Sequence, residues 1–249
     1  MEASTVAVVT GASRGLGLAL AKQLLASGAS VITIARTHND ELADAARPHN
    51  GRLQQLQADL SDPAAIEDVA ARMSAALSGD AERFLLLNNA GTVDPIAAGE
   101  KLTDAAAIGR AFTLNVTAVM VLTAAFLQAT PDSADRRILN ISSGAGRKPT
   151  RGWGVYCATK AALDHYTRVL ADEHPDIPMA SLAPGVVDTG MQERIRSSER
   201  QDFPELDRFL HLHEQGLLVN AETTASRILN HLLSDAYGHQ VIDDIRNYV

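Results

Sequence analysis

Residues 5–17 read TVAVVTGASRGLG, and this stretch decides the fold. The first six residues are apolar, rich in β-branched side chains and followed directly by glycine, which predicts a buried parallel strand rather than a helix. Leucine and alanine then recur at helical spacing over residues 16–27. A strand, a glycine-rich turn and a helix in this order predict the first unit of an α/β sheet that binds a ligand at the turn.

The rest of the chain continues the alternation of strands and helices. Further strands are predicted at Ser30–Ala35 and at residues 53–58, 84–88, 137–142 and 178–182. Helices are predicted at residues 64–77, 103–128 and 154–172, followed by a helical C-terminal part. This order predicts a Rossmann-type, doubly wound parallel sheet with helices on both faces and right-handed crossovers.

The chain length predicts a single domain that spans residues 1–249. With 249 residues, 46% of them hydrophobic, the chain is long enough to bury one large core. Residues 191–216 interrupt the alternation with a polar, mostly helical segment after a strand end, where open α/β sheets bind ligands. Two interpretations of this segment stay open: a substrate lid, or a solvated pair of surface helices.

Charge and composition argue against several kinds of partner. The net charge is −8, and the basic residues are scattered rather than clustered, so nucleic acid is not expected. The first ten residues lack a basic leader, and no apolar stretch approaches the length of a membrane span, so no membrane partner is expected. His165, His211 and His213 form no convincing metal set. The single cysteine, Cys157, forms no internal disulfide, which favours a cytoplasmic protein.

The glycine-rich turn is a candidate phosphate site. Gly11, Gly15 and Gly17 lie between the first strand and the first helix, where backbone N–H groups and the helix dipole can hold a pyrophosphate. Their spacing, G-x-x-x-G-x-G, differs from the usual G-x-G-x-x-G of dinucleotide-binding proteins. A tight loop that merely closes a strand–helix unit would have the same composition, so the position of the turn carries the prediction.

The choice of cofactor depends on the end of the second strand. An enzyme that uses NAD usually has an acidic residue there for the ribose hydroxyls, whereas this chain has Arg36. Together with Arg14 in the glycine turn, Arg36 could clamp the 2′-phosphate of NADP(H). Each arginine alone could also be an ordinary surface charge.

Tyr156 and Lys160 form a candidate catalytic pair. They are four residues apart in a predicted helix and therefore share one face. A cation near a phenol lowers the pKa of the phenol, which suits Tyr156 to proton exchange with a ketone oxygen. Ser143, at the end of a predicted strand, offers a hydroxyl to the same oxygen, with Ser142 as the competing candidate.

Six motifs occur in the order and spacing of one enzyme family. They are TGASRGLG at residues 10–17, NNAG at 88–91, Asn115, Ser143, YCATK at 156–160 and PGVVDT at 184–189. The chain resembles the short-chain dehydrogenase/reductase family over nearly its whole length. The resemblance implies that Tyr156 is the general acid, that Ser143 polarises the carbonyl, that Lys160 lowers the tyrosine pKa and binds the nicotinamide ribose, and that Asn115 completes a proton relay through water.

The resemblance also implies a cofactor site and a homodimer. The expected cofactor-binding residues are Gly11, Ser13, Arg14, Gly15, Leu16, Gly17, Arg36, Asp59, Leu60, Asn88, Ala90, Gly91, Tyr156, Lys160, Pro184, Gly185, Val187 and Thr189. In this family, helices at the positions of residues 103–128 and 154–172 usually form the dimer interface. Their faces here are rich in alanine and leucine, which permits close packing.

Within the family, the chain resembles sepiapterin reductases and bacterial benzil reductases, notably in APGVVDTGMQ followed by DFPELDRF. The resemblance implies an NADPH-dependent carbonyl reductase whose leading substrate class is a vicinal dicarbonyl. Ser143, Trp153, Tyr156 and Met191 are the expected substrate contacts, although Trp153 and Met191 could equally serve in packing. A pterin anchor at Asp243 is an open question. The alternatives are a dehydrogenase that oxidises another small alcohol with NAD, and a regulatory protein that binds NADP without turnover.

Overall fold

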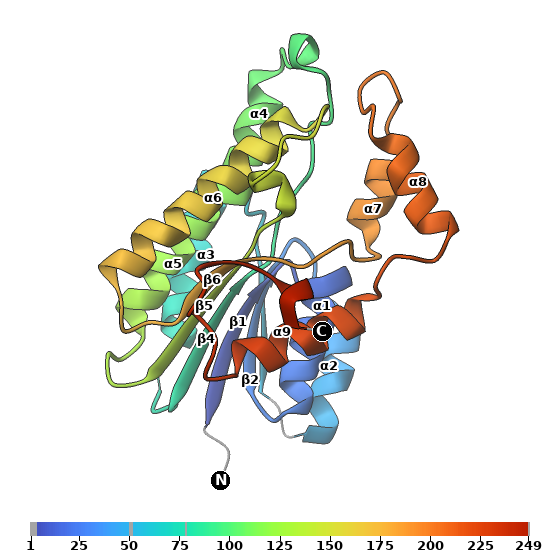
Figure 1. Cartoon of the computed structure of the whole chain (residues 1–249). Coiled ribbons are helices and arrows are strands. Elements are labelled where there is room, and N and C mark those ends of the chain that lie inside the picture. Colours follow the sequence, from blue (N-terminus) through green and yellow to red (C-terminus); the bar gives the residue numbers. More distant parts are fainter. Residues whose placement is uncertain (1–3, 50–51, 78, 249) are drawn as a thin grey trace.

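Parallel strands form the centre of the computed structural model, which describes residues 4–49, 52–77 and 79–248 (Figure 1). Within these residues one seven-stranded sheet has the order β3-β2-β1-β4-β5-β6-β7, and every neighbouring pair is parallel. The strands are β1 (Thr5–Thr10), β2 (Ser30–Ala35), β3 (Leu53–Gln57), β4 (Arg83–Asn88), β5 (Asp135–Ile141), β6 (Met179–Ala183) and β7 (Ile242–Asp244). The predicted Rossmann-type parallel sheet is confirmed. The first three residues of the N-terminal segment lie outside the described residues.

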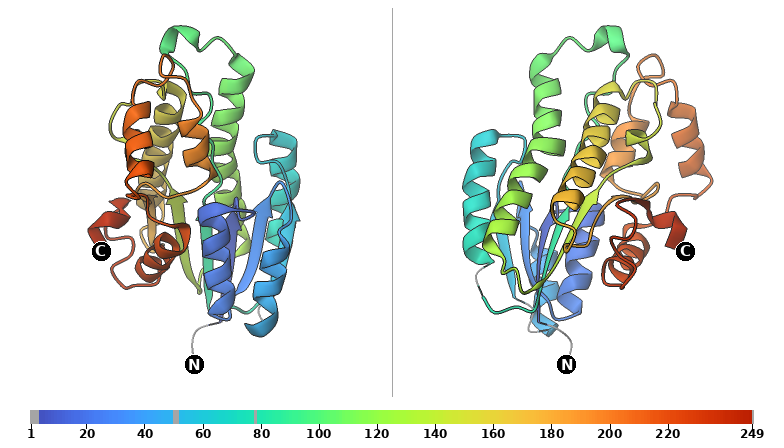
Figure 2. Two further views of the ribbon diagram at one scale, coloured as in Figure 1. Left: turned by 90° about the vertical axis from the view of Figure 1, so that its right-hand side faces the viewer. Right: turned by 60° about the vertical axis from the view of Figure 1, so that its left-hand side comes forward.

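Helices cover both faces of the sheet (Figures 1 and 2). One face carries α1 (Gly15–Ala26), α2 (Asp40–Ala46) and α9 (Ala221–Leu232). The opposite face carries α3 (Pro63–Ala76), α5 (Ala118–Ala129) and α6 (Gly154–Glu173), and α4 (Ala105–Phe112) extends beyond the sheet. Short 3₁₀ turns lie at Arg47–His49, Gly99–Lys101, Gly144–Gly146 and Ile245–Tyr248.

The alternation of side chains along the strands produces two cores, one on each face. Because successive residues of a strand point to opposite sides, Ala7 and Val9 join the core under α1 and α9, whereas Val8 joins the core under α3 and α5. Leu85 and Leu86 of β4 divide in the same way. Strands that are apolar on both sides are therefore buried on both sides, as a parallel sheet requires.

Two elements differ from the sequence-based prediction because their local signals are weak. Helix α2 reads DELADAA, which is only seven residues long, and the side chain of Asn39 caps its N-terminus by accepting from the Glu41 N–H. Strand β7 reads IDD, and neither its length nor its composition indicates a strand. Pairing with β6 fixes it at the edge of the sheet.

The helix predicted at residues 103–128 is interrupted. A π-helical segment, Thr113–Thr117, joins α4 to α5 and contains Asn115. The resulting helical run, Ala105–Ala129, is long and apolar enough by length and composition to cross a membrane, so the expectation that no stretch approaches that length is wrong. Val119, Leu122 and Phe126 of this run are buried in the core. A core helix of a folded domain can have the same length and apolar composition as a membrane-spanning helix.

Helices α7 (Gly190–Arg196) and α8 (Leu206–Glu214) stand beyond the carboxyl ends of the strands (Figure 1). This α7–α8 unit forms a third, aromatic core with Trp153 at the start of α6. The chain order reverses between β1 and β4, which is the position where doubly wound sheets bind ligands. The fold therefore directs the search for a site to the space between that edge and the α7–α8 unit.

Candidate active site

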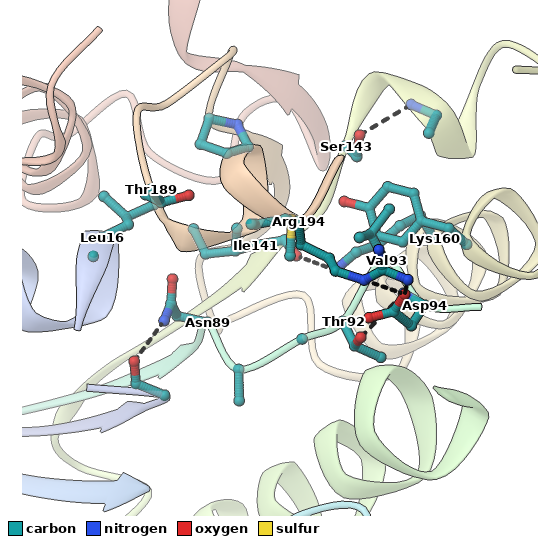
Figure 3. A pocket seen from close by; sticks show the side chains of 18 of the residues that line it. Leu16, Asn89, Thr92, Val93, Asp94, Ile141, Ser143, Lys160, Thr189 and Arg194 are labelled. Carbon is teal, nitrogen blue, oxygen red and sulfur yellow. Dashed lines mark hydrogen bonds and ion pairs between the residues drawn. The ribbon is translucent and has the colours of Figure 1, made fainter. Parts of the chain in front are cut away.

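A cleft of about 1290 Å³ lies at this edge of the sheet (Figure 3). It is lined by the turn after β1, the ends of β2, β4, β5 and β6, and helices α6, α7 and α8. The structure brings most of the predicted site residues together along it, namely Gly11, Ser13, Arg14, Gly15, Leu16, Arg36, Asp59, Leu60, Ala90, Gly91, Ser143, Trp153, Tyr156, Lys160, Pro184, Gly185, Val187, Thr189 and Met191.

The glycine turn has no room for side chains. A Cβ on Gly11 would lie 2.9 Å from the Ala90 Cα, and one on Gly17 would lie 2.4 Å from the Gly11 carbonyl oxygen. Gly11 also has a φ of 69°, which favours glycine. No side chain caps the N-terminus of α1, which begins at this turn, and its first turn contains no acidic residue. The turn thus fits an anionic group held by backbone N–H groups.

Of the predicted cofactor residues, Gly17 and Asn88 do not line the cleft. Gly17 acts beneath the turn, by the close packing just described. The Asn88 side chain is buried, where its Nδ2 donates to Asn140 Oδ1 at 2.9 Å. The neighbouring Asn89 lines the cleft instead (Figure 3). Its Nδ2 donates to the Thr10 carbonyl at 2.9 Å. At this point the cleft is therefore lined by Asn89 and not by the predicted Asn88.

The two predicted cofactor-selecting arginines lie in different surroundings. Arg36 follows β2 and lines the cleft near Asp59. The pKa of Asp59 is lowered, chiefly because the Ser61 backbone N–H donates to it and in smaller part by the Arg36 charge. The Arg14 guanidinium lies beside Gly190, at the start of α7. Asp59 already accepts both the backbone N–H and the hydroxyl of Ser61, so the carboxylate at this end of the cleft is well satisfied.

Ser143, Tyr156 and Lys160 all line the cleft near the end of β5, where Figure 3 shows Ser143 and Lys160. Burial raises the pKa of Tyr156 to about 12, although a hydrogen bond with Ser143 acts in the opposite direction. Burial lowers the pKa of Lys160 to about 8. Lys160 Nζ lies 5.8 Å from the Tyr156 ring centroid and donates to the Ile141 carbonyl at 2.7 Å, so the effect of Lys160 on the tyrosine pKa stays a prediction.

Asn115 approaches the same cluster from behind, without lining the cleft. Its Oδ1 accepts from the Thr92 N–H at 2.9 Å, and its Nδ2 donates to the Thr92 carbonyl and to Thr159 Oγ1. A Cβ on Gly91 would lie 3.2 Å from Asn115 Oδ1 and 3.7 Å from Lys160 Nζ. Both polar atoms of the amide therefore hold the loop after β4 against α6. Single-turn π segments are frequent at functional sites, and this one carries that amide.

The other end of the cleft has an aromatic wall. The Trp153 ring stacks on Phe203 with centroids 4.9 Å apart and packs against Phe209 at 5.3 Å. It also meets the edge of Tyr156 at 5.3 Å. Trp153 and Met191 both line the cleft, so Trp153 joins the wall to the buried aromatic core of the α7–α8 unit. Trp153 therefore has a packing role, and its contact with a substrate stays a prediction.

An ion pair links the α7–α8 unit to the opposite side of the cleft. Arg194 Nε donates to Asp94 Oδ1 at 2.9 Å, and Figure 3 shows the pair beside Thr92 and Val93. A second pair joins Lys101 and Asp202. Sequence reasoning missed both pairs, because residues about 100 positions apart give no local signal.

Asp243 does not face the cleft. It is 1% exposed and accepts from Tyr248 Oη at 2.7 Å, and His231 Nε2 lies 3.1 Å from the same oxygen. The next residue, Asp244, lines the cleft and pairs with Arg246. The Asp243 carboxylate is therefore directed into the protein, away from the cleft.

Comparison with known proteins identifies the family of this chain. A family model described as short chain dehydrogenase matches residues 5–200. The chain belongs to the short-chain dehydrogenase family. It is 38% identical over 236 residues to a benzil reductase ((S)-benzoin forming) of Bacillus cereus, which covers 92% of this chain and 94% of that relative. It is 37% identical over 245 residues to a sepiapterin reductase of Meriones unguiculatus, with 93% and 92% coverage.

Solved structures agree with this assignment. The crystal structure of angucycline C-6 ketoreductase LanV with bound NADP matches with a TM-score of 0.78 and 26% identity, over 97% of this chain and 93% of that chain. This short-chain dehydrogenase is thus an oxidoreductase that acts on CH–OH or C=O groups of small molecules and uses a nicotinamide cofactor.

Proposed function

We propose that this short-chain dehydrogenase is an NADPH-dependent carbonyl reductase that acts on a vicinal dicarbonyl compound such as benzil, or on the side-chain carbonyl of sepiapterin. The observation that carries the proposal is the aromatic wall of Trp153 and Phe209, which lines the same cleft as Ser143 and Tyr156 and in which Trp153 packs edge-on against the Tyr156 ring at 5.3 Å. An aryl group packed on this wall puts the neighbouring carbonyl at the hydroxyls. The named activities of the benzil and sepiapterin reductases support the same class.

When bound, NADPH supplies a hydride to the carbonyl carbon. Tyr156 donates its proton to the carbonyl oxygen as the C=O bond becomes C–OH, and the phenol regains a proton from solvent. A phenol with a pKa of about 12 still carries its proton at neutral pH, as a general acid must. Ser143 donates a hydrogen bond to the same oxygen, and the Lys160 ammonium favours the transient phenolate and holds the nicotinamide ribose.

The cofactor would lie along the glycine turn with its adenine at Asp59 and Leu60 and its nicotinamide between Pro184 and Thr189. The uncapped start of α1 suits the pyrophosphate. Arg36, in place of an acidic residue, favours the 2′-phosphate of NADP(H), and the NADP bound in the ketoreductase LanV agrees. In this proposal Asn115 keeps the loop after β4 in place and takes part in the proton relay.

A vicinal second carbonyl should matter for turnover. We expect kcat/KM for benzil to exceed that for deoxybenzoin, which has one carbonyl fewer, by about tenfold or more, since one charge-assisted or neutral hydrogen bond contributes about 1 kcal/mol and the second carbonyl also activates the first. Steady-state NADPH consumption with the two diaryl compounds measures the ratio. Equal kcat/KM values for benzil and deoxybenzoin would contradict a preference for dicarbonyl substrates and would be consistent with a general ketone reductase.

The pH dependence should report Lys160. Because burial lowers the pKa of Lys160 to about 8, its ammonium is present below that pH and is lost above it. We expect kcat/KM for reduction to be level near neutral pH and to fall about tenfold per pH unit above pH 8. Tyr156, with its pKa raised to about 12, contributes no limb in this range. A rate that stays level to about pH 10 would contradict the role given to Lys160.

Three further features belong to the proposal. The segment 191–216, which contains α8 and nearly all of α7, acts as a substrate lid held by the Arg194–Asp94 pair. A homodimer is supported by the exposed apolar side chains of Phe112, Met120 and Val169 on α4, α5 and α6. A cytoplasmic location agrees with a single cysteine, which is free.

A further inference from the structure

A buried carboxylate lies behind the catalytic cluster. Asp164 of α6 is 4% exposed and does not line the cleft. Its Oδ1 accepts the hydroxyls of Ser142 at 2.5 Å and Ser181 at 2.6 Å, and its Oδ2 accepts Arg147 Nε at 3.1 Å. A carboxylate excluded from water is costly unless it is paired and hydrogen-bonded, and this one has three donors.

Arg147 links the Asp164 carboxylate to strands β6 and β7 through hydrogen bonds. Its two terminal nitrogens donate to the Asp243 carbonyl of β7 at 2.8 Å and to the Ser181 carbonyl of β6 at 3.0 Å. Arg147 directly follows the 3₁₀ turn Gly144–Gly146, which begins just after Ser143. The network thus ties α6, β6 and β7 to the segment that carries Ser143.

Helix α6 holds the end of β5 at two consecutive residues. Lys160 donates to the Ile141 carbonyl, and Asp164, one helical turn later, accepts from the hydroxyl of Ser142. Ser143 is the next residue, and Tyr156 lies one turn before Lys160 on the same helix. The separation of the Ser143 and Tyr156 hydroxyls therefore depends on the two hydrogen bonds that join α6 to residues 141 and 142.

We propose that Asp164 is a positioning residue, which holds Ser143 against Tyr156 through its hydrogen bond with Ser142. The inference rests on the roles proposed above for Ser143 and Tyr156. It also accounts for the two adjacent serines: both residues line the cleft, but the Ser142 hydroxyl is taken up by its hydrogen bond to Asp164, which leaves the Ser143 hydroxyl for the substrate. A purely structural carboxylate would stabilise the fold and leave the rate per folded molecule unchanged.

Two serines provide a matched test, since both are buried and both donate to the same oxygen of Asp164. Ser142→Ala and Ser181→Ala each remove one such bond, but only Ser142 adjoins Ser143. We expect similar losses in Tm, a kcat about tenfold lower for Ser142→Ala, a kcat within about twofold of wild type for Ser181→Ala, and an unchanged KM for NADPH in both. Asp164→Asn should lower kcat at least as much as Ser142→Ala.

A second measurement needs no turnover and so separates this inference from the choice of substrate. Amide hydrogen exchange in a peptide covering residues 141–147 should accelerate in Ser142→Ala and Asp164→Asn and stay at the wild-type rate in Ser181→Ala. Equal exchange and equal kcat in the two serine variants would overturn the positioning role. Failure of the wild type to reduce dicarbonyls would instead refute the proposed function, with the exchange comparison still deciding the role of Asp164.

Discussion

Tyr156→Phe is expected to lower kcat by about a thousandfold, because the variant keeps the ring in the aromatic wall and loses only the proton donor. Burial raises the pKa of Tyr156 and leaves the residue only 7% exposed. Water therefore reaches this position poorly and cannot readily take over as the proton donor in the variant. Steady-state kinetics with NADPH and benzil measures the effect.

The control for this variant is cofactor binding. NADPH binding, followed by nicotinamide fluorescence, should stay within about threefold of wild type, because a single hydroxyl contributes little to a contact surface of this size. Binding without consumption in the variant, beside consumption in the wild type, also excludes a regulatory protein that merely holds NADP. Tyr156→Phe with full activity would remove Tyr156 from the chemistry.

Arg36→Asp is expected to reverse the cofactor preference. The variant replaces a cation with the acidic residue that NAD enzymes have at the end of the second strand, so a 2′-phosphate meets repulsion and ribose hydroxyls gain an acceptor. Loss of a charge-assisted contact is worth about 2 kcal/mol, which raises the KM for NADPH roughly 30-fold.

NADH serves as the internal control for Arg36→Asp, because it lacks the 2′-phosphate. Its kcat/KM should hold or rise in the variant, which shows that the fold and the catalytic cluster are intact. The preference is measured as the ratio of kcat/KM values for the two cofactors. An unchanged ratio would show that Arg36 is a surface charge, and attention would move to Arg14.

The sheet could be predicted from sequence because its signals are local. The runs TVAVVT and SVITIA are apolar on both faces, and only a strand buried on both sides accommodates them. The π segment at Asn115 could not be predicted, since its sequence, TLNVT, gives no break in helical spacing. The break accompanies the hydrogen bonds of the Asn115 amide with Thr92 and Thr159.

Sequence motifs predicted most of the residues that line the cleft. The features that depend on burial were not predicted. Asn88 and Asn89 are indistinguishable in NNAG, but the period of two in β4 turns one toward the core and leaves the next at the cleft. The pKa values of Tyr156 and Lys160 depend on how far water is excluded, which four-residue spacing does not reveal. The role of Asp164 could not be predicted from sequence, because its hydrogen-bond partners lie outside its own helix.

The most direct test of the central claim is to mix the wild-type protein with NADPH and benzil and to measure cofactor oxidation and benzoin formation together. The proposal predicts that the two rise in equal amounts and that NADH supports the reaction far less well. Absence of NADPH oxidation with benzil, with a short aliphatic diketone and with sepiapterin would contradict it, and would leave an oxidoreductase of this family with a different carbonyl or alcohol as its substrate.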